Sequence, residues 1–528
     1  MGDMNSKALR TALGTNDEIA LLDLREQGEF GTCHLFWAVN APLSRLEFEM
    51  TRLVPRKSTA VVVVTAGDAV LAARGAAALA KMGYTDVTVC SDTPDDWASA
   101  GFTIYSGINV PSKAFGEAVE HHYGTPSVDA SELKAMQDRG DDLVVLDSRT
   151  FAEYNNMNIP RGVSVPGGEL AYRVRDLAPS PETLVVVNCA GRTRSILGAQ
   201  SVINAGIANK VVALENGTMG WHLAGLELEH GRTDRFSPGD PETLDAAIAM
   251  RDRIAAEHAI ETIDHARLVE WRGEVDRRTL YLLDVRDPDE FAAGHLPGSR
   301  SAPGGQLVQA TDFQIGVPNA RIVLIDDTGV RATMTAHWLV QMGYPDVYVL
   351  DGGLSGKLKT GTRADASFVD IPVIDADTLA ESMSDNNVTV LDLGESRVFR
   401  KGHIPGAKWA IRSRIATSGP VLPADGTLVL TSDDGRLAAL ALYEARTLSK
   451  AEVLVLCGGT NAWVAAGHPT EADPAYPADE DCIDVYLRAY DRNTDVEARM
   501  QEYIDWEVAL MDQIAADDDV TFRMGTVI

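Results

Sequence analysis

One cysteine in this chain is followed by a loop that can turn a thiol into a nucleophile. The segment 185–195 reads as a β-branched strand ending on Cys189, a short loop with one glycine and two arginines, and the start of a helix predicted over Ile196 to Ala205. Successive backbone N–H groups and a helix N-terminus would then face the sulfur, and Arg192 and Arg194 add positive charge. Both effects favour the thiolate, so the loop predicts a sulfur nucleophile at Cys189.

A cysteine at the end of an apolar strand is more often a small buried side chain than a nucleophile. Cys189 differs because Gly191, Arg192 and Arg194 follow it directly, before a helix. This combination favours the reactive interpretation, and the other four cysteines have no comparable loop. Cys457, for example, follows an apolar strand and is expected to be buried.

The frame around this loop occurs four times. In each copy a strand ends on an aspartate, and an apolar strand, a glycine-containing loop and a helix follow at nearly the same distance. The strand-end aspartates are Asp23, Asp147, Asp284 and Asp392, and the residues at the cysteine position are Thr65, Cys189, Asp327 and Asp433. Self-similarity of this kind is typical of a chain built from repeated domains. Since only the second copy has a thiol there, the other three are predicted to be inactive.

Each copy alternates apolar strands with helical patterns, which indicates the α/β class, with a parallel sheet covered by helices on both faces. Ligands bind such sheets at the C-terminal ends of the strands, which is where Cys189 falls. The predicted domains are residues 1–105, 127–234, 262–363 and 373–472, followed by a helical C-terminal extension over 473–528. Residues 106–126, which contain proline and glycine, are predicted to connect the first two domains.

The C-terminal extension carries apolar residues at helical spacing. These are Tyr503, Trp506, Leu510 and Ile514. Such a stripe is typical of a packing face, so we predict contact with another domain or with a second copy of the chain rather than a cofactor site.

The repeated motifs together resemble the rhodanese (sulfurtransferase) domain, and four copies in one chain resemble the four-domain rhodanese-type sulfurtransferases of bacteria. The resemblance covers most of the chain and implies a parallel five-stranded sheet in each domain. The six-residue loop from Cys189 to Arg194 fits the sulfurtransferases, because the related dual-specificity phosphatases have a loop one residue longer. The implied reaction moves sulfur from thiosulfate through a Cys189 persulfide to cyanide or a thiol, without a cofactor.

The resemblance makes Cys189 the catalytic residue and assigns the rest of its loop to the sulfur donor. The implied substrate-binding residues are Ala190, Gly191, Arg192, Thr193, Arg194 and Ser195. Their N–H groups would stabilise the thiolate and the persulfide, and the two arginines would hold the anionic end of the donor. Asp147, Arg149 and Glu153 also recur in copies without a nucleophile, apart from substitutions in the fourth, so we predict that they support the fold.

Composition argues against several other classes of protein. The chain has 528 residues, of which 45% are hydrophobic and 23% are charged, as in globular proteins. A formal net charge of −30 argues against nucleic acid or an anionic membrane as partner. The sequence shows no apolar run of membrane-spanning length and no cysteine or histidine cluster with metal-ligand spacing. Five scattered cysteines indicate a reducing compartment, so we expect a cytoplasmic protein without a metal.

Three functions stay open from the sequence. The favoured one is a thiosulfate sulfurtransferase with a small anionic donor and a thiol or cyanide acceptor. A 3-mercaptopyruvate sulfurtransferase is the second, although family members that use this donor usually carry a less basic loop. The third is a persulfide carrier or docking scaffold without turnover, in which the inactive copies bind a partner. A homodimer is compatible with each of them.

Overall fold

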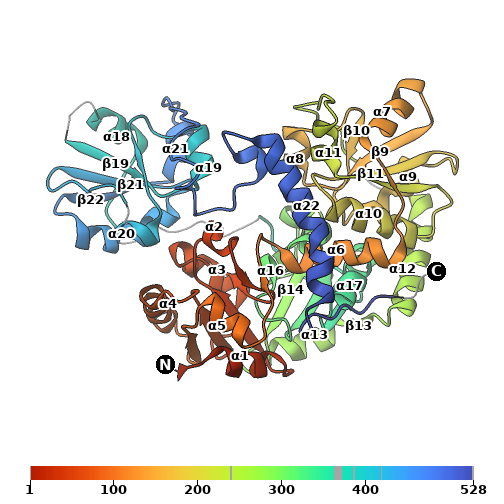
Figure 1. Cartoon of the computed structure of the whole chain (residues 1–528), viewed down its shortest axis with the longest axis horizontal. Helices are drawn as coiled ribbons and strands as arrows, with labels where there is room; N and C mark the ends of the chain where they lie inside the picture. The colour runs from red at the N-terminus through yellow and green to blue at the C-terminus, as the bar shows by residue number, and fades with distance from the viewer. Residues whose placement is uncertain (1, 238–240, 362–370, 384–386, 418, 526–528) are drawn as a thin grey trace.

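The computed structural model describes residues 2–237, 241–361, 371–383, 387–417 and 419–525. It contains four five-stranded parallel sheets, one in each repeat, which confirms the predicted fold class (Figure 1). In every sheet the first strand in sequence lies at an edge, and the second lies between the third and the fourth. Parallel neighbours need crossover connections, and helices supply them.

The four sheets consist of the following strands. The first has β1 (Gly2–Asp3), β2 (Ile19–Asp23), β4 (Val39–Asn40), β5 (Ala60–Val64) and β6 (Val87–Cys90). The second has β8 (Ser127–Val128), β9 (Leu143–Asp147), β10 (Gly162–Ser164), β11 (Leu184–Asn188) and β12 (Val211–Leu214). The third has β13 (Glu261–Ile263), β14 (Leu280–Asp284), β15 (Arg300–Ser301), β16 (Arg321–Ile325) and β17 (Val347–Leu350). The fourth has β18 (Val373–Ile374), β19 (Val388–Asp392), β20 (Lys408–Trp409), β21 (Thr427–Thr431) and β22 (Glu452–Leu456).

The helices that matter for the site fall into three groups. Those that follow the cysteine-position loop are α4 (Ala69–Lys81), α10 (Thr193–Asn204), α17 (Val330–Gln341) and α20 (Arg436–Leu448). Those around the second and third loops are α8 (Phe151–Asn156), α9 (Leu170–Leu177), α11 (Gly217–Leu223) and α15 (Gly304–Gln309). Those outside the repeats are α6 (Val110–Tyr123), α12 (Pro241–Glu257) and α22 (Val496–Ala515). Helix α10 therefore begins three residues before the predicted start, so its first turn is part of the loop.

The connection predicted over 106–126 is mostly a helix, α6, which the sequence analysis did not predict. Pro111 lies in its first turn, where the missing N–H is no loss, and Gly124 ends the helix with φ +64°. Proline and glycine here mark the two ends of one buried helix. Val110, Ala114 and Phe115 on it are fully buried.

The repeats contact one another at several places. The second and third repeats meet before α9 and at α15, where a Cβ on Gly305 would lie only 2.7 Å from the Cα of Gly167. The first and fourth repeats meet through ion pairs, with Arg412 2.8 Å from Glu47 and Arg414 2.6 Å from Glu29. Helix α22 packs along α6, so the end of the chain returns to the second repeat (Figure 1).

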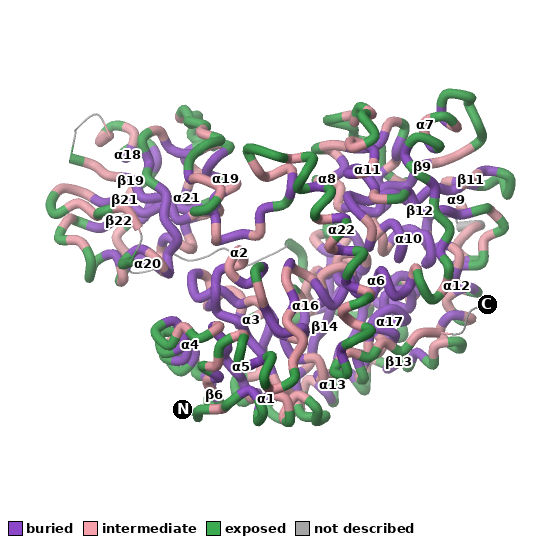
Figure 2. The backbone as a smooth tube through the Cα atoms, in the orientation of Figure 1, coloured by how far each residue is buried: buried purple, intermediate pink, exposed green. Residues whose placement is uncertain are grey.

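The buried residues follow the sheets and the helices between them, with α6 and α10 among the most completely buried elements (Figure 2). The largest apolar cluster crosses repeat boundaries, because Phe115 of α6 and Ile196 of α10 belong to the same cluster as residues of the first and third repeats. Within the described residues, no helix has the length and apolar character needed to cross a membrane.

Candidate active site

Cys189 lies directly after the buried strand β11, at the C-terminal edge of the second sheet. Val185, Val186 and Val187 have no exposed surface, which fixes the end of this strand between β9 and β12. The Cys189 side chain is 2% exposed. Its Sγ lies 3.1 Å from the Oγ of Ser195, a distance at which the hydroxyl can donate a hydrogen bond to a thiolate.

Helix α11 holds the backbone of the cysteine loop from the opposite side. The N–H of Thr218 donates to the Cys189 carbonyl over 2.8 Å, and the N–H of Met219 donates to the Ala190 carbonyl over 3.0 Å. Gly217 permits this approach, because a Cβ there would lie 2.3 Å from the Cys189 carbonyl oxygen. The carbonyls of Cys189 and Ala190 are thus hydrogen-bonded to α11, which fixes the start of the loop.

A cavity of about 60 Å³ opens over Cys189. It is lined by the predicted loop residues Cys189, Ala190, Gly191, Arg192, Thr193 and Arg194. Ser195 is buried beneath the loop and reaches the sulfur directly. A space of this size holds a few water-sized groups, so it suits a small ion better than a bulky organic molecule.

The two loop arginines are paired with carboxylates. Arg192 donates to both oxygens of Glu117 over 2.8 Å and also pairs with Glu120, both on α6. Arg194 donates to both oxygens of Glu153 over 2.8 Å. Each arginine therefore reaches the cavity with much of its charge offset.

Glu117 and Glu153, which form the bidentate pairs with the loop arginines, have pKa values shifted in opposite directions. Burial raises the pKa of Glu117 to about 7, and the opposing effect of Arg192 is smaller. Burial would also raise the pKa of Glu153, but the guanidinium groups of Arg194, Arg488 and Arg149 together outweigh it and hold that pKa well below its usual range. Glu153 thus stays charged across neutral pH, whereas Glu117 titrates near it.

The predicted support residues form one connected network beneath the loop. Arg149 donates to both carboxylate oxygens of Asp147, the closer at 2.7 Å, and to the Met157 carbonyl over 2.5 Å. Asn188 donates to Asp147 over 3.1 Å and so links the network to β11. Glu153 accepts from the N–H of Thr150 at the start of α8 and connects this helix to Arg194.

Several residues of the cavity come from outside the second repeat and were missed from the sequence. They are Lys113 on α6, Gln309 on α15, and Tyr486, Arg488, Tyr490, Tyr503, Trp506 and Glu507 in the C-terminal extension. The apolar stripe on α22 was the available signal. Leu510 and Ile514 pack in a cluster that also contains Tyr105 of the first repeat, as expected of an interdomain face. Trp506 belongs to the same cluster and also lines the cavity, as does Tyr503.

Glu507 connects α22 to the cysteine loop. It accepts hydrogen bonds from the backbone N–H and the hydroxyl of Thr193, and its side chain is 1% exposed. Its Oε1 lies 3.7 Å from the Nζ of Lys113, which in turn donates to the hydroxyl of Tyr503. The loop is therefore covered by a buried polar cluster supplied by two distant segments.

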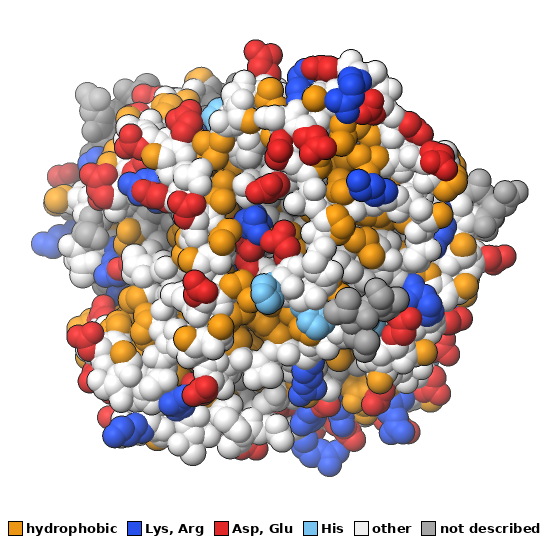
Figure 3. Space-filling model, turned by 45° about the vertical axis from the view of Figure 1, so that its right-hand side comes forward, with side chains coloured by type: hydrophobic (Ala, Val, Ile, Leu, Met, Phe, Trp, Pro, Cys, Tyr) orange, Lys and Arg blue, Asp and Glu red, His pale blue; other side chains and the backbone are white. Residues whose placement is uncertain are grey.

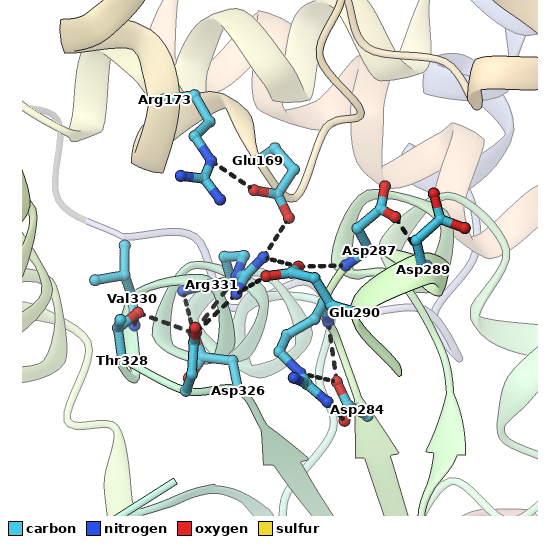
Figure 4. Close-up of polar contacts among 12 residues, drawn as sticks. Glu169, Arg173, Asp284, Asp287, Asp289, Glu290, Asp326, Thr328, Val330 and Arg331 are labelled. Atoms are coloured by element: carbon cyan, nitrogen blue, oxygen red, sulfur yellow. Dashed lines mark hydrogen bonds and ion pairs between the residues drawn. The ribbon is translucent and has the colours of Figure 1, made fainter. Parts of the chain in front are cut away.

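The third repeat has a closed loop at the equivalent place. Asp326, which aligns with Asn188, accepts from the N–H groups of Gly329 over 2.5 Å and Arg331 over 2.9 Å. The fully buried Arg331 side chain donates to Asp327, Glu290 and Glu169, the last on the second repeat (Figure 4). A carboxylate thus takes the loop N–H groups, and the arginine serves the interface between repeats.

The structure also shows the surroundings of Thr65 and Cys457. Thr65 of the first repeat donates its hydroxyl to the carbonyl of Asp68 within its own loop. Cys457 is exposed, so the expectation that it is buried was wrong; β22 ends at Leu456, and the cysteine belongs to the turn. Among the residues the structure describes, no cluster of three or more potential metal ligands is found.

Acidic side chains are numerous on the face of the molecule that Figure 3 shows. Asp and Glu side chains are spread over the face in Figure 3, with Lys and Arg between them, and they do not form one patch. This matches the net charge of −30. Cations at the cavity are therefore a local feature and not part of a broad basic surface.

Comparison with known proteins identifies the repeated unit. A family model described as Rhodanese-like domain matches residues 6–100, 129–224, 265–359 and 375–466. A crystal structure of a thiosulfate sulfurtransferase from Pseudomonas aeruginosa is 45% identical, covers 100% of both chains, and superposes with a TM-score of 0.90.

Shorter curated relatives match one part of the chain. The thiosulfate sulfurtransferase GlpE of Pseudoalteromonas translucida is 27% identical over 92 residues, which is 17% of this chain and 85% of the relative. GlpE of Pseudomonas aeruginosa is 35% identical over 75 residues, which is 14% of this chain and 64% of the relative.

Proposed function

The chain belongs to the rhodanese-like family, and on this premise we propose that it is a thiosulfate sulfurtransferase with a single reactive centre at Cys189. The observation that carries the proposal is the cysteine loop of the second repeat. It combines a cysteine at a strand end, backbone N–H groups without an acceptor among the described residues, and a cavity of about 60 Å³. The similar Pseudomonas aeruginosa chain bears the same activity in its name and supports this choice of reaction.

Sulfur transfer would proceed in two displacements. The Cys189 thiolate attacks the outer sulfur of thiosulfate; a new S–S bond forms, and the old one breaks as sulfite leaves with its electron pair. Cyanide or a thiolate then attacks the terminal sulfur of the persulfide and removes it as thiocyanate or a new persulfide, which restores the Cys189 thiolate. Neither displacement needs a metal or a redox cofactor.

The loop stabilises negative charge on sulfur at each stage. Among the described residues, no acceptor is found for the N–H groups of Ala190, Gly191 and Arg192, so these groups are available to the thiolate and the persulfide. Ser195 adds a hydroxyl at 3.1 Å. Fixed donors aimed at a charged atom are worth about 100- to 1000-fold in rate when one of them is removed from an enzyme.

The size of the cavity favours thiosulfate over 3-mercaptopyruvate as donor. A persulfide carrier without turnover remains the rival from a different class. The buried position of Cys189, 2% exposed, supports the enzyme, because a carrier must present its persulfide to a partner's active site.

The test is mass spectrometry and turnover on the full chain. Treatment with thiosulfate should add one sulfur to the peptide containing Cys189, and Cys189→Ser should abolish thiocyanate formation. Cys457→Ser is the matched control, since Cys457 is exposed but has no such loop, and it should retain activity. Turnover in Cys189→Ser would refute the single centre, and sulfur transfer only in the presence of a protein partner would favour the carrier.

A further inference from the structure

Four basic side chains line the cavity over Cys189, and they differ in how far their charge is already balanced. They are Lys113, Arg192, Arg194 and Arg488. Any donor with an oxyanion end needs positive charge that is not already committed to a carboxylate. The partners of each side chain therefore decide which of them is suited to hold that end.

The loop arginines are committed. The bidentate pairs of Arg192 with Glu117 and of Arg194 with Glu153 each offset one positive charge. Either guanidinium could bind the donor fully only by giving up its partly buried ion pair. Breaking such a pair is costly.

Lys113 is committed in a different way. Its side chain is 8% exposed, and its Nζ lies between the Tyr503 hydroxyl and the Glu507 carboxylate, 4.5 Å from the centre of the Tyr503 ring. Burial lowers the pKa of this amine. Lys113 thus belongs to the wall that joins α6 to α22.

Arg488 is the exception. Its Nη1 donates to the Tyr490 hydroxyl over 3.2 Å. Throughout the described chain no carboxylate forms a salt bridge with its side chain; Glu153, which is paired with Arg194, attracts it only from beyond contact distance. It is exposed and borders the cavity. A guanidinium with free donors in a planar fork matches an oxyanion better than an ammonium does.

The backbone of Arg488 is held in place although its side chain is open to the cavity. Its N–H donates to the Asp491 carboxylate over 3.1 Å, and its carbonyl accepts from the Asp491 N–H over 3.0 Å. Asp491 is anchored to the fourth repeat by an ion pair with Arg397, also at 3.1 Å. The fourth repeat thereby helps to position a residue that lines the cavity of the second repeat.

We propose that Arg488 binds the oxyanion end of the sulfur donor, so that the C-terminal extension completes the donor site of the second repeat. This inference rests on the proposed function and names a donor-binding residue outside the repeated domain. It gives the extension and the fourth repeat a role in specificity, because both are needed to place the guanidinium.

Kinetics with thiosulfate on the full chain test the inference. Arg488→Gln should raise the KM for thiosulfate about 10- to 100-fold with kcat within about threefold, since a lost charge-assisted contact weakens binding of the ground state and transition state alike. The KM of Arg488→Lys should lie between those of the native chain and Arg488→Gln. Arg499→Gln, which removes an exposed arginine of α22 paired with Glu502, is the matched control and should leave KM unchanged.

Binding measured without turnover separates this inference from the proposed function. Calorimetric titration of Cys189→Ser with thiosulfate should show binding that is weakened by the same factor in Cys189→Ser/Arg488→Gln. Equal affinity in the two proteins would overturn the role of Arg488, whatever the activity of the native chain. A native chain that binds thiosulfate through Arg488 but transfers no sulfur would overturn the proposed function and leave Arg488 as an anion site.

Discussion

The loops of the second and third repeats share one frame, and in both an arginine pairs with the glutamate of the helix after the strand-end aspartate, Glu153 or Glu290, but the residue before the cysteine position differs. In the second, Asn188 donates to Asp147, and within the described residues the N–H groups of Ala190, Gly191 and Arg192 have no acceptor. In the third, the Asp326 carboxylate accepts from two loop N–H groups, and Arg331 is buried against Glu169 of the neighbouring repeat. In the third loop the Asp326 carboxylate thus occupies N–H groups that could bind an anion, and Arg331 forms part of the interface with the second repeat.

The third loop therefore differs from the second in more than its missing cysteine. Arg331 lies in the centre of the cluster in Figure 4, with carboxylates from both repeats around it. Burial raises the pKa of Asp326 to about 6, and Arg331 only partly opposes this effect. The third loop is therefore predicted to stay silent even with a thiol restored.

The largest expected effect comes from placing a cysteine in the silent loop. Asp327→Cys in a Cys189→Ser background should give thiosulfate sulfurtransferase activity at least about 1000-fold below the native chain, because the N–H groups that would stabilise a thiolate remain bound to Asp326. Persulfide formation is measured by mass spectrometry of the peptide containing residue 327.

The control adds Asp326→Asn to the same variant. Removing the carboxylate should release the loop N–H groups and make the new thiol react faster with an alkylating reagent. If Asp327→Cys alone matched Cys189 in rate, the internal carboxylate would not explain the silence of this loop.

The converse change introduces the carboxylate into the active loop. Asn188→Asp places a second negative charge 3.1 Å from Asp147, and repulsion should turn the new carboxylate towards the loop N–H groups, as in Asp326. We expect kcat/KM for thiosulfate to fall about 100- to 1000-fold and the reaction of Cys189 with an alkylating reagent to slow.

Asn188→Ala separates charge from the lost contact. It removes the hydrogen bond to Asp147 without adding a carboxylate and should cost less than about tenfold. Equal losses in the alanine and aspartate variants would show that the contact with Asp147, and not the occupied N–H groups, controls the loop.

The sequence predicted the fourfold frame and the cysteine loop well because both are local. Strand, loop and helix are consecutive around Cys189, and the same periodicity recurs in each repeat. Lys113, Arg488 and Glu507 could not be predicted in the same way, because they reach the loop from segments separated from it by 76 to 318 residues of chain. The partners of Arg192 were hidden for a related reason, since α6 was interpreted as a connection.

The smallest predicted effect is a pH dependence of the KM for thiosulfate, caused by Glu117 beside the second loop. Glu117 pairs with Arg192 beside the cavity, and burial raises its pKa to about 7. Between pH 8 and 6 it takes up a proton, which uncovers part of the Arg192 charge, so the KM for thiosulfate should fall by roughly threefold as the pH falls, consistent with a partly screened charge. Glu117→Gln should flatten this dependence, and the exposed Glu257→Gln on α12 should not.

The same proton acts on stability with a defined sign. The folded-state pKa of Glu117 lies above its ordinary value of 4.5, so the folded chain binds the proton more tightly than the unfolded chain does. This contribution to the free energy of unfolding is present below the ordinary pKa and is lost as the pH rises to about 7. Denaturant unfolding at several pH values should therefore show a flatter profile in Glu117→Gln. A profile identical to that of the native chain, together with an unchanged pH dependence of KM, would mean that Glu117 stays ionised in its pair with Arg192.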